Sequence, residues 1–131
     1  MRSRTIKRIP DTDIVEIRYA GEVSYRYRIE TLDELEAAFV GGKIRYLLVN
    51  YTSAWPSTRP EPAALQEFGM RLGGLQFTDD ARIALLNAPS DVASKTEDVV
   101  TPGGQVIRQF SERDLAIAWL SAGPDMASRH R

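Results

Sequence analysis

The stretch Ile44-Arg-Tyr-Leu-Leu-Val49 is a near-continuous apolar run and the strongest indication of the architecture. Two later runs, Ala81–Asn87 and Val106–Phe110, have the same buried character. Strands that are covered on both faces, as in parallel sheets, have this composition. Because a helical pattern follows each run, the sequence predicts strand–helix units that build a mostly parallel sheet.

Sequence signals that begin or end helices locate the helices expected beside these strands. Ala63–Leu72 has apolar residues at helical spacing and is followed by Gly73-Gly74, a pair that commonly ends a helix. A short helix can begin at Ser90. Ser111-Glu-Arg-Asp114 is a capping box, which predicts a last helix closed by Gly123-Pro124. The inward face of that helix is expected to carry Leu115, Ala118, Trp119 and Ala122.

The N-terminal third predicts a hairpin and a helix. Asp13–Ala20 has the composition of a strand, and Gly21-Glu22 is typical of a tight turn. Val23–Ile29 alternates with period two, which predicts a second strand with tyrosines in the core and arginines in solvent. Thr31-Leu-Asp-Glu34 is another capping box, so a helix is expected from Thr31 to Gly41-Gly42.

The resulting element order is β-β-α-β-α-β-α-β-α. It predicts an α/β fold with a mostly parallel five-stranded sheet, flanked by helices and joined by right-handed crossovers. Residues 12–123 are expected to form a single domain. Residues 1–11 are expected to be a loose N-terminal segment, and residues 124–131 a disordered tail, because both are polar or charged.

Composition excludes several classes of function. The 131 residues contain 17 Lys+Arg and 18 Asp+Glu, and this near-neutral balance argues against a nucleic-acid or membrane-surface binder. The chain has no cysteine, and its one histidine is His130, so thiolate chemistry, a histidine metal site and a Ser-His-Asp triad are not expected. No apolar run is long enough to be a signal or a membrane span, and we expect a cytoplasmic protein.

The C-terminal third resembles a known group of domains. Its strand and helix read Val106-Ile-Arg-Gln-Phe-Ser-Glu-Arg-Asp-Leu-Ala-Ile-Ala-Trp-Leu120, with a strand that closes on Arg-x-Phe and a helix that closes on Ala-Trp-Leu. This ending, with the element order of residues 12–122, resembles the STAS domains (sulfate transporter and anti-sigma factor antagonist), particularly the SpoIIAA-like bacterial branch. The resemblance implies a non-enzymatic regulatory or protein-interaction domain, with a protein partner or a second copy of the chain.

The same resemblance raises two further functions. A distant likeness of this fold group to the Sec14-type lipid-binding fold implies a carrier of a small apolar or lipid-like ligand. Anti-sigma antagonists of the group carry a phosphorylated serine in an Asp-Ser-x-Gly stretch. Here the corresponding segment, Asn50–Pro62, is longer, rich in proline and lacks that motif. Its hydroxyl groups leave Ser53, Ser57 and Thr58 as candidate phosphorylation sites for a phospho-switched antagonist.

A binding site is expected where the parallel strands end, because ligands of open α/β sheets bind outside the carboxyl ends of the strands. The candidate ligand- or partner-binding residues at this edge are Asn50, Tyr51, Thr52, Ser53, Trp55, Asn87 and Ser90. Two alternatives stay open: Ser90 can be a helix cap, and Trp55 can pack under its own loop. Asp11 and Asp13 are expected near the same edge, where a weak Mg²⁺ or Ca²⁺ contact stays open; otherwise no metal or cofactor is expected.

Overall fold

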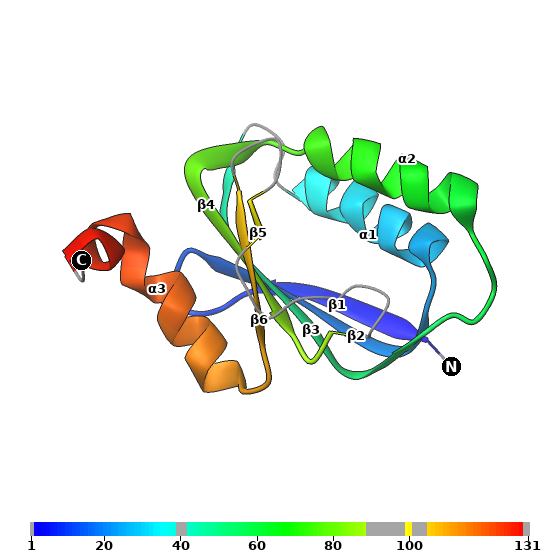
Figure 1. The fold of residues 1–131 in the computed structure, drawn as a ribbon, viewed down its shortest axis with the longest axis horizontal. Coiled ribbons are helices and arrows are strands. Elements are labelled where there is room, and N and C mark those ends of the chain that lie inside the picture. The colour runs from blue at the N-terminus through cyan, green and yellow to red at the C-terminus, as the bar shows by residue number, and fades with distance from the viewer. Residues whose placement is uncertain (1, 39–41, 89–98, 101–104, 130–131) are drawn as a thin grey trace.

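The computed structural model describes residues 2–38, 42–88, 99–100 and 105–129, which form an α/β fold (Figure 1). Its strands and helices are, in chain order, β1 (Ser3–Arg8), β2 (Ile14–Val23), α1 (Tyr25–Ala38), β3 (Ile44–Pro56), α2 (Pro62–Gly73), β4 (Phe77–Leu86), β5 (Val99–Val100), β6 (Val106–Phe110) and α3 (Arg113–Arg129). The expected helix after Ser90 lies outside the described residues.

One mixed sheet of six strands organises the fold, in the order β1-β2-β3-β4-β6-β5. The four inner strands β2, β3, β4 and β6 are parallel, whereas β1 and β5 pair antiparallel at the two edges. Leu47 of β3 lies beside Ile83 of β4, which lies beside Ile107 of β6. The mostly parallel arrangement predicted from the three apolar runs is therefore confirmed.

Helices cover both faces of this sheet. Figure 1 shows α1 and α2 side by side over one face and α3 against the other. Successive side chains of β2 and β3 point to opposite faces of the sheet and therefore belong to two separate hydrophobic cores. Ile17, Tyr19 and Leu47 belong to the core under α1 and α2, and Ile14 and Leu48 to the core under α3.

The prediction of a second hairpin strand over Val23–Ile29 is wrong, because α1 begins at Tyr25. Ser24 caps this helix: its Oγ accepts a hydrogen bond from the backbone N–H of Tyr27 at 3.0 Å. The seven-residue alternation is too short to distinguish a strand from a helix. The buried residues follow the helix instead; they are Tyr27, Arg28, Ile29, Thr31, Leu32 and Leu35, and all but Ile29 recur at helical spacing.

The capping box expected at Thr31 is wrong for the same reason. Thr31 lies inside α1, where its hydroxyl donates to the carbonyl oxygen of Tyr27 at 2.9 Å, one turn earlier. Arg28, expected in solvent, is only 1% exposed. The periodicity of the helix, and not that of a strand, therefore decides which side chains of this segment are buried.

The N-terminal hairpin exists but lies earlier in the sequence. Residues 3–8, expected to be loose, form β1, which pairs from Ser3 beside Ala20 to Arg8 beside Val15. Thr12 shapes the turn, since its hydroxyl donates to the carbonyl of Ile9 at 2.7 Å. The sequence gives little sign of β1 because an edge strand needs few apolar residues.

The last helix differs from its prediction in face and in length. Ala116 and Leu120 are fully buried, whereas Leu115 is 55% exposed and Ala118 is exposed. The buried stripe is therefore shifted by about one residue. The helix also continues past Gly123-Pro124 to Arg129, so the expected disordered tail is helical over most of its length. A Gly-Pro pair removes one backbone donor, which weakens a helix without always ending it.

Candidate functional site

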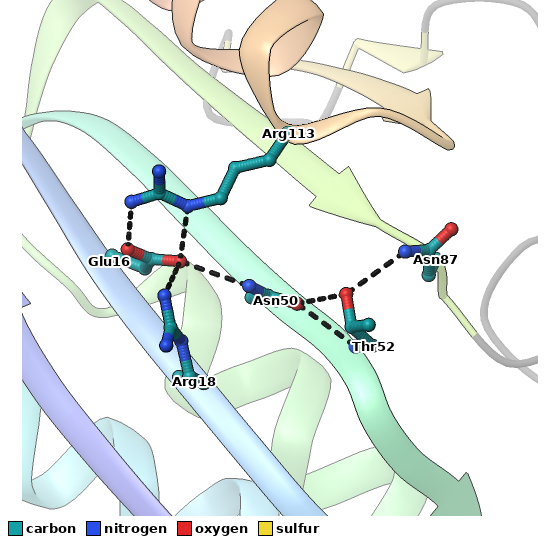
Figure 2. Close-up of polar contacts among 6 residues, drawn as sticks. All are labelled: Glu16, Arg18, Asn50, Thr52, Asn87 and Arg113. Carbon is teal, nitrogen blue, oxygen red and sulfur yellow. Dashed lines mark hydrogen bonds and ion pairs between the residues drawn. The ribbon is translucent and has the colours of Figure 1, made fainter.

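A polar crevice opens where β4 ends, beside the middle of β3 and the start of α3 (Figure 2). Its volume is about 400 Å³. The residues that line it are Arg18, Asn50, Thr52, Ser53, Leu86, Asn87 and Arg113. This is the carboxyl edge of the parallel strands, where α/β sheets bind their ligands.

Glu16 of β2 is the centre of the polar contacts at this crevice. Although it is only 7% exposed, both of its carboxylate oxygens accept hydrogen bonds from Arg113, from Nη2 at 2.7 Å and from Nε at 3.2 Å. Its Oε2 also accepts from Asn50 Nδ2 at 3.1 Å and from Arg18 Nη2 at 3.4 Å. Burial alone raises the pKa of Glu16, but the bonds from Arg113 and Asn50 outweigh it and hold the pKa below its ordinary value.

A chain of hydrogen bonds continues from Glu16 along the rim of the crevice (Figure 2). Asn50 Oδ1 accepts from the backbone N–H of Thr52 at 2.9 Å and from its hydroxyl at 2.6 Å. Asn87 Nδ2 in turn donates to the Thr52 hydroxyl oxygen at 3.0 Å. Asn87 has a φ of +53°, a left-handed conformation that asparagine adopts more readily than most residues. The turn after β4 therefore holds the side-chain amide of Asn87 in place.

The structure brings together four of the seven predicted site residues: Asn50, Thr52, Ser53 and Asn87. Tyr51 does not join them, because alternation along β3 turns it into the core on the opposite face. Trp55 is 57% exposed, so it does not pack under its own loop, and it does not line the crevice. Ser90 lies outside the described residues.

Sequence reasoning missed Arg18 and Arg113, which line the crevice, and Glu16, the buried carboxylate that both of them contact. A signal was present, since Glu16 and Arg18 interrupt the apolar strand Ile14–Val23 at alternate positions. A charged residue inside a buried strand needs a partner. The sequence does not show that this partner comes from the first turn of the last helix.

The three candidate phosphorylation sites have different surroundings. Ser53 is exposed and lines the polar crevice. Ser57 follows β3, and its hydroxyl oxygen accepts a hydrogen bond from the backbone N–H of Arg59 at 3.3 Å. Thr58 is exposed and is not among the lining residues of the crevice. Ser53 is therefore the candidate hydroxyl that lies beside Arg18 and Arg113 in the same crevice.

A second, apolar cavity lies on the other face of the sheet, under α1 and α2. Its volume is about 110 Å³. The lining residues are Ile17, Tyr19, Arg28, Leu32, Leu47, Val49, Tyr51, Phe68, Leu72, Ile83, Leu85 and Ile107. Nearly all of these are aliphatic or aromatic, so this cavity differs in chemistry from the polar crevice.

The polar groups of the apolar cavity belong to Tyr19, Arg28 and Tyr51. The two tyrosine rings stack with their centroids 5.4 Å apart. The Arg28 guanidinium carbon lies 5.7 Å from the centroid of the Tyr51 ring, within the range of a cation–π contact. The Tyr19 hydroxyl donates to Thr31 at 2.8 Å, while burial raises its pKa well above the ordinary value.

The expected position of Asp11 and Asp13 is wrong. Because β2 runs parallel to β3, both residues precede β2 at the edge opposite the crevice. Asp13 contacts Arg45 there, at 3.5 Å. Within the described ranges, no group of three or more His, Asp and Glu side chains is placed to hold a metal ion. The described helices likewise include none that is long and apolar enough to span a membrane.

Comparison with known proteins places the fold. No protein-family model matches the chain, and no curated protein sequence matches it. Among solved structures, it is similar to the crystal structure of an uncharacterized protein from the DUF3478 family with a SpoIIAA-like fold, from Shewanella loihica PV-4. The TM-score is 0.58 at 19% sequence identity, over 91% of this chain and 93% of that chain. This chain has a SpoIIAA-like fold.

The SpoIIAA-like resemblance predicted from the ending Val106–Leu120 is thus confirmed for the fold. The likeness covers nearly the whole of both chains. Function is a separate question, because one fold carries many unrelated activities.

Proposed function

We propose that this SpoIIAA-like protein is a non-enzymatic carrier that binds a small apolar ligand in the apolar cavity under α1 and α2. The observation that carries the proposal is the cavity itself, which has a volume of about 110 Å³ and is lined almost entirely by aliphatic and aromatic side chains. Protein interiors are normally packed without voids of this size. An apolar pocket with a few polar groups is the usual form of a small-molecule site.

The volume restricts the ligand. An engineered cavity of about 150 Å³ that is lined by apolar residues binds benzene, so about 110 Å³ accommodates one small ring or a short branched chain. A complete lipid chain needs more space than this. Within the class of apolar or lipid-like ligands, the geometry therefore favours small ones.

One side of the apolar cavity is suited to entry. Phe68 and Leu72 of α2, with Leu85 of β4 and Ile107 of β6, are only partly buried where they pack against this core. The residues of β2 and β3 that line the cavity, such as Ile17 and Leu47, are 2% exposed. We expect a ligand to enter between α2 and the β4–β6 side of the sheet.

The experiment is a thermal-unfolding titration with toluene and indole as probes. At a free concentration of ten times Kd, binding to the folded state adds ~1.4 kcal/mol, which raises Tm by about 5 °C in a domain of this size. Leu72→Trp fills the cavity and should abolish this shift. Leu65→Trp, on the same helix at a side chain 51% exposed, is the matched control and should retain it.

Two results would contradict the carrier function. One is the absence of any stabilisation of the unmodified protein by either probe. The other is a shift that persists in Leu72→Trp, which would place the binding elsewhere. Circular dichroism of both variants shows whether they fold, and native mass spectrometry of the purified protein tests directly for a ligand that co-purifies.

A second candidate function is a regulatory domain that binds another protein molecule, and it is favoured by Trp55. This ring is 57% exposed near the end of β3, and tryptophan is enriched where protein partners meet. A second copy of the chain is the partner we propose. Light scattering over a range of concentrations should show a dimer that Trp55→Ser weakens, and a monomer at every concentration would contradict this candidate.

A further inference from the structure

The polar crevice carries more positive charge than its buried carboxylate needs. Glu16 is a single anion, yet Arg18 and Arg113 both contact it. Lys7 of β1 lies opposite Glu16 in the register of the β1–β2 pair. Together with Arg18, it lines an adjoining hollow of about 150 Å³. One cation is enough to neutralise a buried carboxylate, so these three cations leave a local surplus.

The surplus charge is accessible. The side chains of Arg18 and Arg113 are 57% and 39% exposed, whereas that of Glu16 is 9% exposed. Asp114, which also acts on Arg113, is exposed on α3, where solvent screens its charge. An incoming ligand therefore meets the guanidinium groups before it meets the carboxylate.

Glu16 also fixes the geometry of the cations. Its two oxygens engage Nε and Nη2 of Arg113, and Figure 2 shows the third guanidinium nitrogen turned away from Glu16. Arg18 approaches the same carboxylate from the opposite side, through Nη2 only (Figure 2). Two guanidinium groups held in this way retain N–H donors for an oxyanion, which they bind more strongly than neutral donors do.

We propose that the polar crevice binds the oxyanion of a small organic molecule, a phosphate or a carboxylate, between Arg18 and Arg113. Ser53 and Asn87 add a hydroxyl and an amide to the lining of the same crevice. A volume of about 400 Å³ exceeds what a bare phosphate fills and lies in the usual range for small-molecule sites. The crevice opens on the α3 face, so this site is separate from the apolar cavity and does not depend on the carrier function.

The test is an NMR titration of the labelled protein with sodium phosphate and, separately, with sodium acetate, at an ionic strength held constant with sodium chloride. The amide signals of Thr52, Ser53 and Asn87 should shift and saturate with at least one of the two anions. Saturation with phosphate identifies a phosphoryl ligand, and saturation with acetate alone identifies a carboxylate. If neither anion gives saturable shifts, the proposal is overturned.

Matched variants locate the site. Arg18→Gln should weaken binding about tenfold, the usual effect of losing a hydrogen bond to a charged group. Arg26→Gln is the control, since Arg26 is 54% exposed and pairs with Glu67 at 3.3 Å, whereas Arg18 is 57% exposed and pairs with Glu16 at 3.4 Å. Asn87→Asp keeps the turn but adds a negative charge, and it should also weaken binding. Equal affinity in Arg18→Gln and Arg26→Gln would overturn the proposal.

Discussion

Both carboxylate oxygens of Glu16 accept hydrogen bonds from the guanidinium group of Arg113, which lies 97 residues further along the chain. This contact joins β2 to the first turn of α3. A bidentate arginine–carboxylate pair has a defined geometry as well as a favourable energy. The same pair therefore holds α3 on the sheet and forms one wall of the polar crevice.

Replacing Arg113 should destabilise the protein more than replacing an arginine of a surface ion pair. Arg113→Gln leaves Glu16 buried with weaker partners, which costs about 2–3 kcal/mol, less than for a fully buried pair because Arg113 is 39% exposed. Arg26→Gln breaks an exposed pair with Glu67 and should cost under ~1 kcal/mol. Urea unfolding measures the loss of unfolding free energy in both variants. Equal losses would show that the Glu16–Arg113 pair contributes no more to stability than a surface ion pair.

Stability should fall in acid partly through Glu16. Its pKa is lower in the folded protein than the ordinary value of 4.5, so the contribution of this carboxylate is complete above that value. As the pH falls through the lowered folded pKa, the carboxylate is protonated and the contribution is lost. The difference in unfolding free energy between the unmodified protein and Glu16→Gln should therefore shrink between about pH 5 and pH 3. A difference that stays constant over this range would contradict the lowered pKa.

The parallel core of the fold was predictable because its strands are buried on both faces. Ile44–Val49 and Ala81–Leu86 contain few polar residues, and such runs fit few structures other than an inner parallel strand. The edge strand β1 has no such pattern, since only Arg4 and Ile6 of its six residues are partly buried. Local composition therefore identifies the inner strands of this sheet and misses its edge.

The candidate site, like the fold, was only partly predictable from the sequence. The carboxyl edge follows from the direction of the strands, which is why Asn50 and Asn87 were expected together and lie in one crevice. Tyr51 was misplaced because the site was predicted by loop position, whereas β3 extends to Pro56 and alternation decides its face. The link from Glu16 to Arg113 depends on how α3 packs, which no local pattern encodes.

Ser24 should stabilise the start of α1, the helix that replaces the predicted strand. Its hydroxyl oxygen accepts a hydrogen bond from the N–H of Tyr27 at 3.0 Å, and loss of a serine N-cap typically costs ~1 kcal/mol. Ser24→Ala should lower the unfolding free energy by about this amount. Ser53→Ala, at an exposed serine in a strand, is the control and should change it by less than ~0.5 kcal/mol. If the two variants unfold at the same urea concentration, Ser24 is not a cap.

Two leucines on α3 test which face of this helix is buried. Leu120 is fully buried in the core beneath α3, whereas Leu115 is 55% exposed. Leu120→Ala should cost about 2–5 kcal/mol, because the truncated side chain leaves a cavity among Ile14, Leu48 and the other residues of that core. Leu115→Ala removes the same atoms from a mostly solvated position and should cost under ~1 kcal/mol. Chemical denaturation compares the two variants directly. A larger loss for Leu115→Ala would restore the helix face expected from the sequence and would also move Arg113 away from Glu16.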